Sequence, residues 1–237
     1  MLPDGGALFE AWRAKHEAIG WKHFIYDGIV SEADWNRSDN KRICFFLKEA
    51  YLKENEKSVL ETWNLADRLA QGFDKRLWKK IALWVYGING TTETTIPSFA
   101  EAQALTREQR QALLRQIAVV NVKKSEGKPG SDGNNLLSVA DKDKELLLRE
   151  LELIQPKIIV CGYTAGLLRL IYGSEIVGNE VDQNSGAISW KQLTRNGYFW
   201  LNDCLVLDCY HPANHFPAQM NYYTVCCLYQ QALKERR

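Results

Sequence analysis

The sequence predicts an α/β fold with three layers, in which helices cover both faces of a central four-stranded parallel sheet. Four short apolar runs, each typical of a buried strand, are separated by segments with helical spacing. The runs are 42–48, 117–122, 157–162 and 204–210. Strands that alternate with helices in this way usually pair in parallel and are buried on both faces.

Helices are expected from apolar spacing and from residues that begin or end helices. Residues 5–19 have helical spacing, and a helical block over 58–86 is broken near Gly72. Thr106 and Gln109 form a capping box that opens another helix. Further helices are expected over 141–155, from Thr164 and over 217–234. The segments expected to be loops are 87–97, 123–135 and 173–203, the last with a possible hairpin.

We expect a single domain over 1–237, because no repeat, low-complexity segment or clear linker divides the chain. Residues 1–40 are expected to form an N-terminal helical extension. A Gly-rich phosphate loop would be expected after the first strand of a nucleotide-cofactor enzyme, and the sequence has none there. This argues against a small-molecule enzyme of that class.

Composition sets limits on what the chain binds. The formal net charge is +1, so attraction to nucleic acid would have to come from a local basic face. The six cysteines include no Cys-x-x-Cys pair, which argues against a zinc site or an iron–sulfur cluster. We recognise no signal peptide or membrane-spanning run. We therefore expect a cytoplasmic monomer with reduced thiols, and no metal, cofactor or membrane.

Chemically useful side chains follow the predicted strands. Glu49 comes just after the first strand, Asn121 ends the second, Tyr163 follows the third and His211 follows the fourth. Ligands of parallel α/β sheets bind outside the carboxyl ends of the strands. A carboxylate, a carboxamide and an imidazole at that edge can activate water, read a polar edge and stabilise a departing anion.

Three motifs at these strand ends resemble those of the uracil-DNA glycosylase superfamily. They are Leu47-Lys-Glu-Ala-Tyr51, Val119-Val-Asn121 and Tyr210-His-Pro-Ala-Asn214. The segments 121–130 and 153–162 are similar to the thermophile-type members, and the resemblance spans residue 42 to the C-terminus. Some positions differ, since Glu49 replaces the common Asp, Ala50 a Pro and Ala213 a Ser. The cluster cysteines of the thermophile type are absent.

The resemblance implies a DNA glycosylase that hydrolyses the N-glycosidic bond of a flipped-out base and leaves an abasic site. Glu49 would orient water and stabilise the cationic sugar, and His211 would hydrogen-bond the O2 atom of the leaving base. Asn121 would read the Watson–Crick edge, because a carboxamide offers both a donor and an acceptor.

Further residues are expected to shape the base pocket and hold DNA. The resemblance implies that Tyr51 restricts bulk at C5 of a pyrimidine, that Trp63 stacks on the base, and that Phe216 is a wedge in the DNA stack. Three lysines beside Asn121 are candidates for gripping phosphates. They are Lys123, Lys124 and Lys128. Structural alternatives stay open: solvated Glu49 and lysines, a backbone-bonded Asn121 or His211, and a core Trp63.

The matched Asn and Tyr favour a uracil-like pyrimidine in base-excision repair. The altered first motif and the long 173–203 segment leave open a bulky modified phage cytosine, such as a glucosylated one, excised as antiviral defence. A third possibility is a non-catalytic nucleic-acid-binding or sensor protein on the same fold, because a fold alone does not fix a function.

Overall fold

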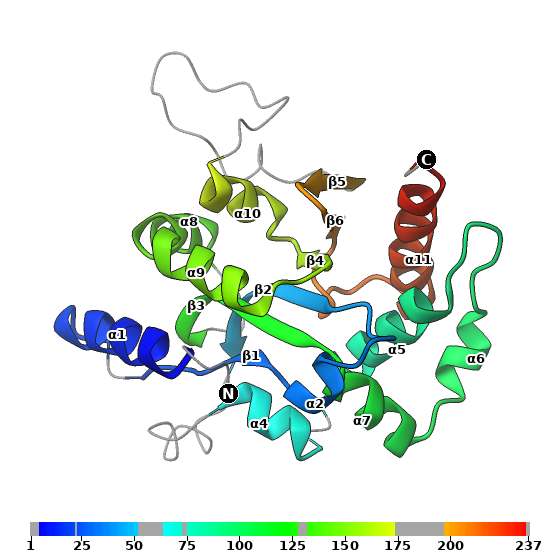
Figure 1. Cartoon of the computed structure of the whole chain (residues 1–237), viewed down its shortest axis with the longest axis horizontal. Helices are drawn as coiled ribbons and strands as arrows, with labels where there is room; N and C mark the ends of the chain where they lie inside the picture. Colours follow the sequence, from blue (N-terminus) through cyan, green and yellow to red (C-terminus); the bar gives the residue numbers. More distant parts are fainter. Residues whose placement is uncertain are drawn as a thin grey trace, which may run out of the picture.

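The computed structural model describes residues 5–21, 23–51, 64–72, 75–127, 132–173 and 197–235. Within these ranges, six strands form one mixed sheet in the order β1-β3-β2-β4-β6-β5. Their bounds are β1 Gly28–Ile29, β2 Ile43–Tyr51, β3 Ala118–Gly127, β4 Ile158–Gly162, β5 Gly197–Leu201 and β6 Cys204–Cys209. The chain therefore has the α/β fold that the sequence predicts (Figure 1).

The sheet differs from the expected four-stranded parallel one. The four predicted strands are β3, β2, β4 and β6, and they are parallel neighbours in the middle of the sheet. An antiparallel strand is added at each edge, because β5 turns directly into β6 and β1 pairs with β3. The β5–β6 turn holds Asn202 in the left-handed region with φ 52°, which a two-residue hairpin turn favours.

Helices cover both faces of the sheet (Figure 1). Alternate residues of β2 divide between two cores, with Phe45 and Leu47 in one and Cys44 and Phe46 in the other. The first core is closed by α4 Leu65–Ala70, α5 Arg76–Gly90, α7 Arg107–Arg115 and α11 Ala218–Glu235. The second is closed by α1 Gly5–Ala18, α8 Gly133–Lys142, α9 Lys144–Ile154 and α10 Ala165–Tyr172. Two short helices, α2 Glu32–Trp35 and α6 Phe99–Gln103, lie in the connections.

Several helix boundaries follow the sequence signals. Helix α1 matches the expected 5–19 segment, and the capping box of Thr106 and Gln109 opens α7. The expected helix over 141–155 is instead two helices that meet at Asp143. The expected loop over 123–135 is also wrong. Strand β3 continues to Gly127, and α8 begins at Gly133 after the N-cap Asp132.

The first forty residues contribute more than a helical extension. Strand β1 joins the sheet beside β3, and α1 packs against α9. Asp27, directly before β1, is buried against β3. The N-terminal segment thus supplies polar groups to the interior of the sheet.

Candidate functional site at the strand ends

Glu49 lies near the carboxyl end of β2 and is paired with Lys123 of β3. The two residues are register partners, and Lys123 Nζ is 3.1 Å from Glu49 Oε2. Their side chains are 7% and 16% exposed, so the pair is mostly shielded from water. Gly127 makes room for it, because a Cβ at that position would lie 2.5 Å from Glu49 Cγ. The fold therefore fixes the direction of the carboxylate.

His211 follows β6 and presents a neutral imidazole. The Ala213 N–H donates to His211 Nδ1 over 3.2 Å, which leaves Nε2 to carry the ring proton. Burial lowers the pKa of His211 from 6.5 to about 4, and the cationic Lys48 and Lys80 lower it further in the same direction. At neutral pH the ring is thus an uncharged hydrogen-bond donor through Nε2.

Gly162, at the end of β4, brings His211 next to the strand that carries Glu49. A Cβ on Gly162 would lie 3.3 Å from His211 Cδ2 and 2.7 Å from Leu47 Cδ2. Leu47 is two residues before Glu49 on the same strand and therefore on the same face. The carboxylate and the imidazole thus occupy one edge of the sheet, as the strand-end argument predicts.

An aromatic cluster lies beside His211. The rings of Tyr163 and Tyr210 are stacked, with centroids 6.5 Å apart and planes 10° from parallel. Phe216 meets Tyr210 edge-on at 5.0 Å and is 45% exposed. Lys48 Nζ lies 4.9 Å from the centre of the Tyr163 ring. Tyr210 is absent from the residues proposed above, although its place at the end of β6 could have indicated it.

The loop between β6 and α11 is held from two sides. Lys80 of α5 donates to the carbonyls of Pro212 and Asn214 at 2.9 and 3.3 Å. The carboxamides of Asn214 and Asn221 bond to each other in both directions, at 2.9 and 3.0 Å. The Phe216 N–H donates to Asn214 Oδ1. These contacts fix the loop that carries both His211 and Phe216.

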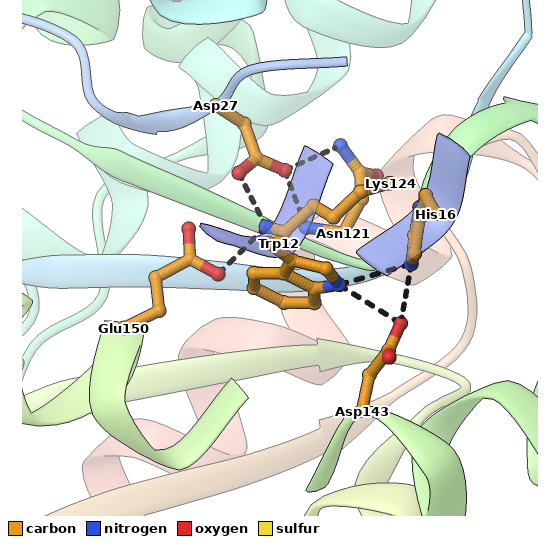
Figure 2. Close-up of polar contacts among 7 residues, drawn as sticks. All are labelled: Trp12, His16, Asp27, Asn121, Lys124, Asp143 and Glu150. Atoms are coloured by element: carbon orange, nitrogen blue, oxygen red, sulfur yellow. Dashed lines mark hydrogen bonds and ion pairs between the residues drawn. The ribbon is translucent and has the colours of Figure 1, made fainter. Parts of the chain in front are cut away.

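Asn121 lies within β3 rather than at its end, and it is only 2% exposed. Its backbone N–H and its Nδ2 both donate to Asp27 Oδ2, at 2.8 and 3.0 Å (Figure 2). Asn121 pairs with Leu47 in the register of β2 and β3, two positions before Glu49 and Lys123. It is therefore close to the carboxylate, with a partner that the sequence did not indicate.

The structure corrects the assignment of Lys124 to phosphate binding. Its side chain is fully buried, and Nζ lies 2.5 Å from Asp27 and 2.6 Å from Glu150 (Figure 2). A buried ammonium held by two carboxylates cannot reach DNA. Lys123 is also mostly buried, against Glu49. Trp63 and Lys128 lie outside the described residues, and so does the side chain of Tyr51.

A second polar group lies behind the first, where α1 meets the junction of α8 and α9. Trp12 Nε1 donates to Asp143 Oδ2 at 2.9 Å, and His16 Nε2 is 2.8 Å from the same oxygen (Figure 2). Burial alone would raise the pKa of Asp143, but hydrogen bonds from His16, Lys15 and Trp12 lower it. These contacts attach α1 to the body of the fold. The functional residues that sequence reasoning missed, Asp27 and Glu150, carry no local motif.

No protein-family model, curated protein or solved structure matches this chain. Within the described ranges, no helix combines the length and apolar character that crossing a membrane requires. The same residues contain no group of three or more His, Cys, Asp or Glu side chains arranged to hold a metal ion. The proposals below therefore rest on the geometry at the strand ends.

Proposed function

We propose that this protein is a DNA glycosylase that hydrolyses the bond between deoxyribose and a flipped-out pyrimidine. The observation that carries the proposal is the pairing of a fixed carboxylate with a neutral imidazole donor at one sheet edge. Cleavage of this bond develops positive charge on the sugar and negative charge on the departing base. Glu49 suits the first charge, and His211 Nε2–H suits the second.

The reaction would proceed by water addition. The electrons of the C1′–N bond leave with the base, and His211 stabilises the negative charge at the base oxygen by hydrogen bonding. A water oxygen bonds to C1′, and Glu49 accepts the proton that this water loses. The products are the free base and an abasic site. Tyr163, Tyr210 and Phe216 support DNA as the substrate, because aromatic rings stack on exposed bases.

The decisive variant is Glu49→Gln, tested on oligonucleotides carrying uracil, modified cytosines or other altered bases. Abasic sites are scored by strand cleavage in alkali. We expect turnover to fall by on the order of a hundredfold or more, because the amide cannot accept the proton of water. DNA affinity should change little. The control is Glu145→Gln, an exposed carboxylate on α9, which should keep wild-type turnover. Equal turnover in Glu49→Gln would remove Glu49 from the chemistry.

The ion pair between Lys123 and Glu49 favours a second candidate, a non-catalytic nucleic-acid-binding protein. A carboxylate that is committed to a lysine can serve structure instead of chemistry. In that case the wild type would bind single-stranded DNA and form no abasic site from any base in the panel. Glu49→Gln would then lower stability without changing an activity, which separates the two functions.

A further inference from the structure

Three hydrogen-bond donors converge on the buried carboxylate of Asp27. Asn121 supplies its backbone N–H and Nδ2 to Oδ2, and Lys124 Nζ reaches Oδ1 (Figure 2). Asp27 is 6% exposed, Asn121 2% and Lys124 0%. Donors and acceptors buried to this degree seldom lack partners, so the arrangement is strongly constrained.

This convergence fixes which way the Asn121 carboxamide faces. Turning the amide over would place Asn121 Oδ1 against Asp27 Oδ2, where two acceptors would repel. Nδ2 therefore stays toward Asp27, with one of its two hydrogens engaged there. The other hydrogen and Oδ1 keep a single donor–acceptor order toward any ligand that meets this side chain.

The charges around Asp27 hold it in place. Lys124 is the cation of the group and contacts both carboxylates. Burial raises the pKa of Glu150 well above its usual value; Lys124 opposes this shift and the Asp27 carboxylate adds to it. A protonated Glu150 leaves one positive and one negative charge, so the buried group is neutral overall. Asp27 is thus the carboxylate that remains ionised beside Asn121.

We propose that Asp27 is a positioning residue that sets Asn121 to read a 4-keto pyrimidine edge, as in uracil, instead of a 4-amino edge, as in cytosine. This inference rests on the glycosylase function proposed above. A uracil edge offers a keto oxygen beside an N–H, which fits one amide donor and one amide acceptor. Cytosine and its 5-modified forms present the opposite order and would need the amide turned over. The glucosylated-cytosine alternative is therefore disfavoured.

The test uses Asp27→Asn, because an amide offers one acceptor oxygen where the carboxylate offered two. The charged Lys124 should take that oxygen, which turns the new NH₂ toward the donors of Asn121. Glu150 can then ionise and replace the lost negative charge, so the variant should fold. The matched control is Asp143→Asn, a buried carboxylate of the second polar group with no contact to Asn121.

Two readouts are measured on the full chain. The first is the ratio of excision rates for uracil and cytosine at one position of a single-stranded oligonucleotide, together with binding to both strands. The wild type should prefer uracil, and Asp27→Asn should lower the ratio by on the order of tenfold or more. Asp143→Asn should keep the wild-type ratio even if it is less stable. The second readout is the side-chain ¹⁵NH₂ signal of Asn121, identified by its loss in Asn121→Leu, which should shift in Asp27→Asn alone.

The outcomes separate the inference from the function on which it rests. A wild type that excises cytosine as readily as uracil, or an Asp27→Asn variant with an unchanged ratio and NH₂ signal, overturns the inference and leaves the glycosylase intact. A wild type that excises no base defeats the proposed function; the binding preference and the NH₂ signal then decide whether Asp27 sets the Asn121 edge. If Asp27→Asn fails to fold, the wild-type uracil preference remains the deciding measurement.

Discussion

At the scale of single residues, His211 shows how surroundings choose a protonation state. Its ring is buried at the end of β6 and has two lysines nearby, and both conditions penalise the imidazolium ion. The Ala213 N–H selects the tautomer, because an acceptor at Nδ1 requires the proton on Nε2. A neutral donor suits an anionic leaving group in one respect: it loses no proton to solvent across the neutral pH range.

The pH behaviour of His211 follows from its lowered pKa. The unfolded chain binds a proton near pH 6.5, whereas the folded chain does so only near pH 4. Between these values the unfolded state holds more protons, so His211 makes the protein less stable as the pH falls from 6.5 to about 4. An NMR titration of the ring should give a midpoint near 4, with the signal identified by its loss in His211→Gln. A midpoint close to 6.5 would contradict the buried, neutral ring.

At the scale of elements, the loop from β6 to α11 is a rigid support for an exposed aromatic ring. Its carbonyls bind Lys80 of α5, and Asn214 is bonded to Asn221 of α11. Phe216 extends from this support with 45% of its surface exposed. A ring held in this way can fill the space that a flipped nucleotide leaves in a duplex.

Phe216→Ala should therefore slow excision from duplex DNA strongly and from single strands little. Flipping a paired base costs a few kcal/mol, and much less when the base is already unpaired. The ratio of the two rates is the observable, because a general folding defect cancels from it. Ile19→Ala removes another exposed apolar side chain, just past α1, and should leave the ratio unchanged. An unchanged ratio in Phe216→Ala as well would make Phe216 a packing residue.

At the scale of the whole molecule, buried charges join segments that are far apart in the sequence. Asp27 precedes β1, Lys124 belongs to β3 and Glu150 to α9, and all three meet in the interior. Lys124 Nζ also lies 5.0 Å from the centre of the Trp12 ring of α1. The N-terminal segment is thereby attached to the sheet by ionic and cation–π contacts as well as by apolar packing.

The members of this charge group should contribute unequally to stability. Lys124→Met should lower the free energy of unfolding by about 3–5 kcal/mol, because it leaves Asp27 buried without a cation. Glu150→Gln should change it by less than about 1 kcal/mol, because Gln resembles the protonated acid. Urea unfolding measures both values. Equal losses in the two variants would show that Glu150 is ionised in the native state, contrary to the direction of its pKa shift.

The sequence by itself determined the four central strands, their parallel pairing and the strand-end places of Glu49 and His211. These features are local, since a buried strand is a run of apolar residues and a strand end is the polar residue after it. The capping box at Thr106 is equally local and was predicted correctly. Repeated short-range patterns are what a single sequence displays.

Only the tertiary structure decided the partners of the polar residues. Lys124 looks like a surface lysine in a polar loop, and it is buried because Asp27 and Glu150 arrive from 97 residues before and from α9 after it. The same contact turns the expected loop into a longer β3. An ion pair forms wherever two charges meet in space, and no local pattern encodes such a meeting. Sequence therefore located the reacting edge, and long-range packing decided how Asn121 and Lys124 are used there.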